Sequence, residues 1–378
     1  MVQAFQQKKI TNILFFKTMI FCWFLIKIIS WKVWMPERIL PTIPFFEWTT
    51  KPEFSYFLFG GSMFFLGGLF FLKPNRILFF LFIFIELAQL LLDQNRWQPW
   101  EYQFLLTTIF FVFYGNAVDF KKLILLLLCS TYIFSGLQKF NLGFLESNWG
   151  NLILKRIFGI QQYWKTNDFL FYFGYSIPII ETTLGILLLV LKNKKMPIIG
   201  LIVMHLFILY ILSPLGVNYN EVVWPWNLMM IFYLIFLLKD TFEYQVSFSF
   251  LKNKFVGLMI VLLFILPLSN LFGYWEHYLS FGLYSGKNTN ICVCFDESNE
   301  TKALSSHISK TNKYGFCPNQ SAIFINKWAL ATLKVPIYPE ERAYRVFEKR
   351  FESQFPNTKF QWIYYKPDHT LKLRKQSP

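Results

Sequence analysis

The feature that most constrains this chain is a series of apolar runs, each close to the length that crosses a bilayer. A helix needs about 20 mostly apolar residues to span roughly 30 Å of hydrocarbon. Only 16% of the residues are charged, whereas a soluble chain carries about 25%. The sequence therefore predicts an all-α polytopic membrane helix bundle over residues 1–273. We expect about nine spans, near residues 11–30, 54–72, 76–93, 101–116, 121–138, 169–191, 196–213, 223–239 and 254–273.

Residues 274–378 have a different character, with mixed polar and aromatic sequence. The runs SAIFI and FQWIYY have the length and apolar content of strands, and PEERAYRVFEKRFESQF places Ala343, Phe347 and Phe351 at helical spacing. We expect a small α+β domain outside the membrane, on the extracytoplasmic side. Such a domain could bind a protein partner.

Basic residues gather in alternate short loops, among them Lys8 and Lys9, Lys121 and Lys122, and residues 192–195. Because cytoplasmic loops collect Lys and Arg, this pattern places the N-terminus inside and, after nine spans, the C-terminus outside. The formal charge of +15 lies mostly beside apolar runs, which favours membrane lipid and argues against nucleic acid as a partner. Lysines interrupt the first apolar run and no small-residue cleavage site follows it, so a cleavable signal peptide is not expected.

Ionisable residues within or beside these runs are the candidates for function. Each costs at least about 2.5–3.5 kcal/mol to place in hydrocarbon, and such groups usually persist because they are paired or functional. Lys139 follows the run KKLILLLLCSTYIFSGLQ, Glu181 lies in SIPIIETTLGILLLVLK, and His205 lies in GLIVMHLFILYILS. Asp93 ends the third span and shares a helical face with Glu86. These residues could form a site that opens toward the outer face.

Each candidate has a structural alternative. Lys139 could extend to the outer headgroups, and Asp93 could cap a helix or pair with Arg96. Glu86 could form a hydrogen bond between helices, and His205 could be a neutral, packed histidine.

Aromatic and amide residues near the predicted outer face are candidates to bind a lipid or a quinone ring. They are Trp97, Trp224, Trp226 and Asn227. The tryptophans are equally expected in the aromatic belt at a membrane surface.

The five cysteines divide by location. Cys22 and Cys129 lie in spans, where a thiol is expected to act as a small apolar filler. Cys292, Cys294 and Cys317 lie in the outer domain, where an oxidising compartment permits a disulfide. We expect Cys317 to pair with one of the other two, and we expect no metal because no closely spaced histidines accompany the thiols.

Several stretches carry a resemblance to a known family, namely LLDQNRWQPWEYQF, YIFSGLQKFN, PIIETTLGILLLV, VMHLFILYI, VVWPWNLMM and HYLSFGLYSGK. Over about residues 54–286, the chain resembles the bacterial branch of the HTTM (vitamin K-dependent γ-carboxylase-like) membrane domain. The resemblance places Lys139, within SGLQK, at the position of the proposed catalytic base. It also aligns Asp93, Glu181 and His205 with acidic and histidine positions of the family.

In that family, the lysine is proposed to deprotonate a reduced quinone, so the resemblance implies an isoprenoid quinone and a bacterial cytoplasmic membrane. The lysine must be neutral for this role, because an ammonium group cannot accept a proton. An asparagine-histidine pair of the family aligns here with Asn116 and Ala117, its preceding lysine aligns with Gln138, and the outer domain is small. Glutamate carboxylation is therefore not expected.

Two functions remain after these departures. One is a membrane enzyme that performs proton or redox chemistry on a quinone or similar lipid. The other is a non-catalytic membrane component that binds a partner through its outer domain.

Overall fold

The structure is a computed structural model, and it describes residues 2–46, 52–73, 75–115, 117–160, 167–238, 246–309, 315–367 and 371–373. Its larger part is helical, as the apolar runs predict. The long helices are α1 (Val2–Ile29), α3 (Pro52–Phe71), α4 (Arg76–Leu92), α5 (Pro99–Tyr114), α6 (Asp119–Leu137), α10 (Ser176–Val190), α11 (Lys195–Leu212) and α12 (Val223–Leu238). A last apolar helix runs through α14 (Lys254–Ile260), η3 (Val261–Ile265) and α15 (Leu266–Asn270).

Within the described residues, five helical segments are both long enough and apolar enough to cross a bilayer. They are Ile10–Ile29, Pro52–Phe71, Asp119–Leu137, Asp168–Val190 and Lys195–Leu212, and Val223–Leu238 and Lys254–Asn270 are shorter apolar helices. Each of the nine expected runs is thus at least largely helical within the described residues, but nine crossings stay a prediction.

Large apolar side chains cover much of the bundle surface. On α3, Phe57, Phe64 and Phe71 are 72%, 74% and 79% exposed, and their seven-residue spacing puts them on one face of the helix. A soluble protein rarely exposes an apolar surface of this extent, whereas hydrocarbon tails solvate it without cost.

Helix α6 lies at the centre of the bundle, and it is the most buried of the five long apolar segments. It packs closely on α10 at two glycines. A Cβ atom on Gly136 would lie 2.1 Å from Thr182 Oγ1, and one on Gly185 would lie 2.9 Å from Tyr132 Cβ. Small residues at these points let the two backbones approach, as is typical of helix contacts in membranes.

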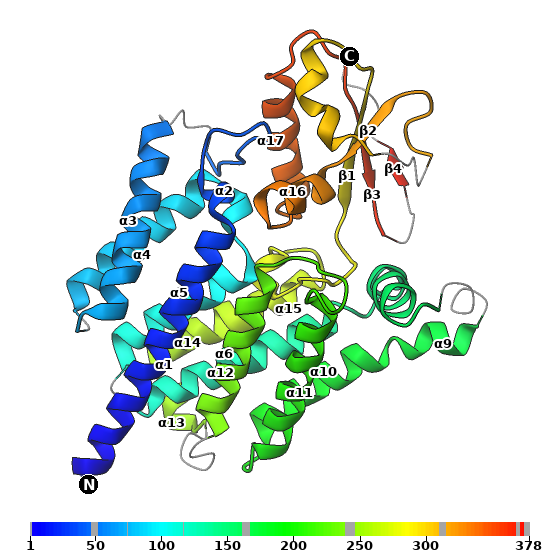
Figure 1. The fold of residues 1–378 in the computed structure, drawn as a ribbon. Helices are drawn as coiled ribbons and strands as arrows, with labels where there is room; N and C mark the ends of the chain where they lie inside the picture. Colours follow the sequence, from blue (N-terminus) through cyan, green and yellow to red (C-terminus); the bar gives the residue numbers. More distant parts are fainter. Residues whose placement is uncertain are drawn as a thin grey trace.

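Short elements fill the end of the bundle that carries the C-terminal domain. They are α2 (Trp31–Trp34), η1 (Gln94–Arg96), α7 (Leu142–Phe144), the π-helix η2 (Leu145–Ile157), α9 (Asp168–Phe173) and η4 (Tyr278–Ser280). The short helix α13 (Phe248–Leu251) lies at the opposite end, as does the N-terminus (Figure 1).

The C-terminal domain is α+β, as the sequence predicts. Its antiparallel sheet has the order β2-β1-β3-β4, with β1 (Asn290–Phe295), β2 (Ser321–Phe324), β3 (Gln361–Tyr365) and β4 (Leu371–Leu373). Val293 of β1 pairs with Ile323 on one side and Trp362 on the other. The helical elements are η5 (Glu300–His307), α16 (Ile325–Leu333) and α17 (Glu341–Glu352). The strands expected at SAIFI and FQWIYY and the helix expected before Phe355 are confirmed.

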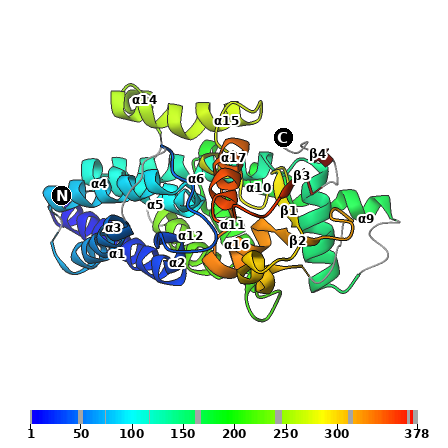
Figure 2. The same cartoon turned by 90° about the horizontal axis from the view of Figure 1, so that it is seen from above.

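The C-terminal domain sits directly on the bundle (Figures 1 and 2). The Tyr338 backbone N–H donates to Asn95 Oδ1 at 3.0 Å, and Gln98 Nε2 donates to the Pro336 carbonyl at 3.1 Å. Both Asn95 and Gln98 are buried by this contact. The domain is therefore held on the bundle by hydrogen bonds between buried groups of the two parts.

Candidate functional site

Three of the four residues expected to be catalytic lie on neighbouring helices. Lys139 follows the end of α6, and its Nζ donates to Glu181 Oε2 on α10 at 2.5 Å and to Ser135 Oγ at 2.8 Å. The Lys139 side chain is 12% exposed and that of Glu181 is 7% exposed. Lys139 therefore turns toward the bundle and a carboxylate, not out to the headgroups.

His205 belongs to a second chain of hydrogen bonds beside this ion pair. Tyr132 Oη of α6 lies 2.8 Å from His205 Nε2 on α11, and His205 Nδ1 lies 2.7 Å from Asn227 Oδ1 on α12. Asn227 Nδ2 in turn donates to the Val223 carbonyl at 2.8 Å. We call Tyr132, Lys139, Glu181, His205 and Asn227 the central polar network.

The two parts of the central polar network meet at α6, which carries Tyr132 and ends just before Lys139. The glycine contacts between α6 and α10 bring these two helices close together. A larger residue at Gly136 would collide with Thr182, and one at Gly185 would collide with Tyr132, so either change would push the two helices apart. The local sequences SGLQK and ETTLG therefore fix the pair by packing as well as by charge.

Asp93 does not join this network. Its carboxylate forms an ion pair with Arg38, accepts from the Ile43 N–H at 3.0 Å and caps η1 at the Asn95 N–H at 3.1 Å. Of the two structural alternatives for Asp93, helix capping is confirmed, and the carboxylate pairs with Arg38 and not with Arg96. Asp93 holds residues 38–43 against the end of α4.

Arg96 is instead buried among backbone carbonyls. Its guanidinium donates to the carbonyls of Val33, Trp34 and Gln89 at 2.9–3.2 Å. A guanidinium with several donors can satisfy acceptors at the ends of two helices at once, so Arg96 ties α2 to α4.

A second buried cluster was not expected as a site. Lys27 of α1 donates to Glu86 of α4 at 2.7 Å and lies 4.0 Å from Glu101 of α5, and all three side chains are 0% exposed. Ser62 of α3 donates to Glu86 at 2.5 Å, and Trp23 donates to Glu101 at 2.7 Å. We call these five residues the N-terminal charge cluster. The alternative that Glu86 bonds between helices is thereby confirmed.

The expected lipid-binding aromatics have protein partners. Trp224 Nε1 donates to the Leu212 carbonyl at 2.9 Å, and Trp226 Nε1 donates to Gln103 Oε1 at 2.7 Å. Trp97 packs edge-on against Phe45, with 6.4 Å between ring centroids. Asn227 belongs to the central polar network, so the structure does not gather these four residues into one surface.

The cysteines of the C-terminal domain lie together. Cys294 and Cys317 form the disulfide, and Cys292 is a buried free thiol whose sulfur lies within 4.8 Å of the other two. Burial raises the pKa of Cys292 to about 12. Because the thiolate is the reactive form, Cys292 is poorly suited to attack the neighbouring disulfide.

Asn116, which aligns with a family asparagine, lies outside the described residues.

Tyr132 and Ser135 are the site residues that sequence reasoning missed. Both lie in an apolar run, where a tyrosine or a serine is unremarkable by composition. A weak signal was present, because Tyr132, Ser135 and Lys139 follow i, i+3 and i+7 spacing on one face of α6.

Residues 173–350, just under half of the chain, match a family described as transmembrane protein of unknown function (DUF3556). The match agrees with the long, lipid-facing helices. The chain is a multi-pass transmembrane protein. The matched region includes Glu181, His205 and Asn227 and continues into α17, so it joins the last membrane helices to the C-terminal domain. No curated protein and no solved structure matches the chain.

Proposed function

We propose that this protein is a membrane enzyme that handles a proton of an isoprenoid quinone, or of a similar lipid, at the central polar network. The ion pair between Lys139 and Glu181 carries the proposal. It lies at the end of α6, almost buried, and the same helix carries Tyr132, which is hydrogen-bonded to His205. Ionisable groups placed in this way within a membrane protein commonly serve proton transfer.

The surroundings of the ion pair fit a ligand that arrives through the lipid. Phe140, next to Lys139, is 45% exposed and stacks on Tyr175 with 5.9 Å between centroids. Ile180, next to Glu181, is 54% exposed. An aromatic head could stack on the exposed Phe140 ring while its hydroxyl group approaches Lys139 and Glu181.

The pair suggests a division of roles between the two side chains. A quinol O–H bond would break with its proton passing to a Glu181 carboxylate oxygen, and the electron pair would stay on the quinol oxygen. The Lys139 ammonium would then face the resulting anion and stabilise it. This assignment differs from the resemblance, in which the lysine itself is the base, because in this structure Lys139 already donates to a carboxylate.

We further propose the finer features that the resemblance and the basic loops support. These are an HTTM-like core, nine crossings, a bacterial cytoplasmic membrane, a cytoplasmic N-terminus and an extracytoplasmic C-terminal domain. The docking of that domain at the end of the bundle nearest Lys139 is consistent with a site on the same side.

The test uses the full chain in lipid nanodiscs without oxygen, titrated with a quinol that has a short isoprenoid tail. We expect wild type to bind the quinol and to give the absorption spectrum of the quinol anion. Glu181→Gln should bind the quinol without forming the anion, and Lys139→Met should bind it at least about tenfold more weakly because a charged hydrogen-bond donor is lost. Lys73→Met, an exposed lysine on the α3–α4 loop, is the control and should behave as wild type. Equal spectra from all four proteins would overturn the proposal.

The non-catalytic alternative rests on a different observation, namely that every side chain of the central polar network has a hydrogen-bond partner. Such contacts also hold membrane helices together. In that case the apolar double variant Lys139→Met/Glu181→Met should fold and keep its partner protein on a native gel, and wild type should show no quinol binding.

A further inference from the structure

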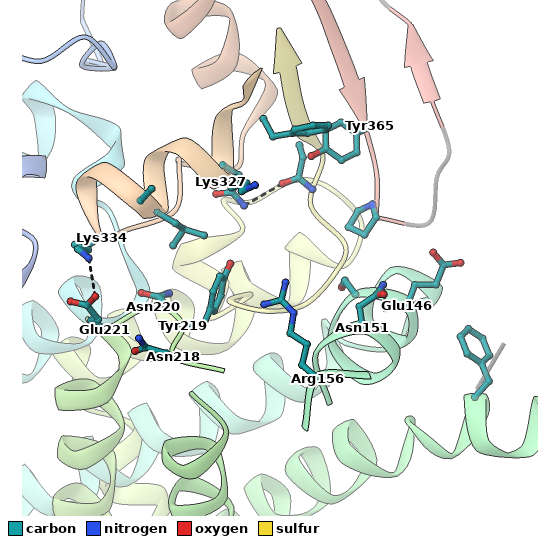
Figure 3. A pocket seen from close by; sticks show the side chains of 18 of the residues that line it. Glu146, Asn151, Arg156, Asn218, Tyr219, Asn220, Glu221, Lys327, Lys334 and Tyr365 are labelled. Atoms are coloured by element: carbon teal, nitrogen blue, oxygen red, sulfur yellow. Dashed lines mark hydrogen bonds and ion pairs between the residues drawn. The ribbon is translucent and has the colours of Figure 1, made fainter. Parts of the chain in front are cut away.

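A large cleft lies away from the central polar network, between the bundle and the C-terminal domain. Its volume is about 1100 Å³, somewhat above the ordinary range of small-molecule sites. The floor comes from η2 and α9, one wall from the 218–221 loop, and the roof from α16 and the ends of β1 and β3 (Figure 3). None of the five network residues lines it.

Five carboxamides contribute to the polar lining of this cleft: Asn151, Asn218, Asn220, Asn290 and Asn326. A carboxamide offers both donors and an acceptor, so it matches a hydroxyl group, which is also both. Asn220 donates through Nδ2 to Tyr284 at 2.8 Å, but its buried Oδ1 has no partner among the described residues. A buried acceptor of this kind calls for a ligand or a water molecule.

The charges of the cleft balance. Among the described lining residues, three cations (Arg156, Lys327 and Lys334) accompany three carboxylates (Glu146, Asp168 and Glu221). Lys334 and Glu221 pair at 2.8 Å. A site for phosphate or another polyanion is expected to carry an excess of positive charge, so the lining favours an uncharged ligand.

Arg156 is the side chain best placed to form hydrogen bonds with such a ligand. It rises from η2 into the middle of the cleft, between Tyr219 and Asn151, with Lys327 and Tyr365 on the opposite side (Figure 3). Its five N–H donors can serve neutral hydroxyl oxygens as well as anions. The tyrosine rings supply flat apolar faces beside these donors.

Unusual backbone surrounds the same cleft. Asn218 and Asn220 adopt φ values of 47° and 55°, in the left-handed region, and η2 is a π-helix of 13 residues. Left-handed non-glycine residues and π-helical turns both occur preferentially at functional sites, where ligand binding justifies their cost.

Exposed aromatic residues lie on the cleft's two floor elements. Phe169 and Phe173 of α9 are 79% and 51% exposed, and Phe158, after η2, is 56% exposed. Trp149 of η2 donates to the Leu170 carbonyl at 2.8 Å, which fixes η2 against α9. Large apolar side chains exposed beside a membrane helix are expected to contact lipid, so a ligand anchored in the bilayer could present its head to the cleft.

We propose that this cleft binds an uncharged, hydroxyl-rich head of the glycosyl class, as presented by a membrane glycolipid. The site does not depend on proton transfer at Lys139, and it would stand if the central polar network were only structural. Arg156, Asn151 and Asn220 would donate to and accept from the sugar hydroxyls, while Tyr219 would cover one face of the ring.

The experiment uses the full chain in phosphatidylcholine nanodiscs that contain either a glucosyl diacylglycerol or phosphatidylglycerol with the same acyl chains. Retention of each lipid is measured by mass spectrometry. We expect the glycolipid to be retained about tenfold over phosphatidylglycerol. A free disaccharide added to glycolipid-free nanodiscs forms a second arm, and saturable binding there would support the same sugar chemistry from a soluble source.

Three variants of adjacent residues sharpen the result. Arg156→Leu should reduce glycolipid retention about tenfold, because it removes hydrogen bonds from a charged donor. Arg156→Gln, which keeps donors but no charge, should lose no more than about threefold. Lys155→Leu, which is exposed but does not line the cleft, should match wild type. Unfolding temperatures show whether each variant is folded.

Two results would overturn the proposal. The first is equal retention of phosphatidylglycerol and glycolipid without disaccharide binding. The second is an equal loss in Arg156→Gln and Arg156→Leu, because that outcome would assign the cleft to an anionic ligand.

Discussion

The N-terminal charge cluster and the central polar network are both buried sets of ionisable residues, but they differ in balance and in position. In the cluster, one ammonium faces two carboxylates and all three side chains are fully buried. In the network, one ammonium faces one carboxylate, and Lys139 and Glu181 keep a small exposure beside lipid-facing residues. A buried set of ionisable groups is therefore not by itself a sign of function, and the remaining exposure of the set has to be considered too. The more accessible pair is the better candidate for chemistry.

The largest expected effect on stability is in the N-terminal charge cluster. Lys27→Met would leave Glu86 and Glu101 buried without their ammonium partner, which should cost about 3–5 kcal/mol in the free energy of unfolding. Thermal unfolding in detergent, followed by tryptophan fluorescence, measures the loss. The exposed Lys73→Met serves as the matched control. An unchanged unfolding temperature in Lys27→Met would break the comparison, because the cluster would then not be structural.

A smaller loss is expected in the central polar network. Asn227→Leu removes the partner of His205 Nδ1, and an unsatisfied buried polar group costs about 1–3 kcal/mol. Leu228→Ala, the next residue and 46% exposed, is the control on the same helix. A loss in Asn227→Leu larger than that in Lys27→Met would reverse the ranking of the two regions.

A third effect should appear outside both regions and depend on pH. Burial raises the pKa of Glu340 to about 7, and its carboxyl accepts from the His277 N–H at 2.8 Å. Because the folded-state pKa lies above the ordinary value of 4.5, the fold favours the protonated acid. Its stabilisation is complete below about pH 4.5 and is lost as the pH rises through 7.

Glu340→Gln, which resembles the protonated acid, tests this expectation. Wild type and variant should unfold at similar temperatures at pH 5, and wild type should unfold a few degrees lower at pH 8. Parallel curves across this range would contradict the assignment. The pair of proteins also shows how much pH dependence arises in the C-terminal domain and not in the membrane.

The sequence was most informative for features that depend on a single helix or strand. Apolar length places the membrane helices to within a few residues, and the strands at Ser321 and Gln361 follow from short apolar runs. The resemblance suggested that Lys139, Glu181 and His205 lie near one another. Their positions near the ends or centres of spans suggested the same. Contacts between segments that are distant in the chain could not be predicted in this way.

Asp93 illustrates the limit. Its partner Arg38 lies in an irregular segment that folds back over α4, whereas Arg96 is nearer along the chain. Lys27 and Glu86 are 59 residues apart and meet only when three helices pack around them. Local pattern does not encode such pairings, because they depend on how helices are arranged around one another.

The contact between Asn95 and Tyr338 also has a consequence for biogenesis. The two residues are 243 positions apart. The hydrogen bond between them can therefore form only after nearly the whole chain has been synthesised. A chain shortened before Tyr338 would present the bare amides of Asn95 and Gln98 at the end of its bundle.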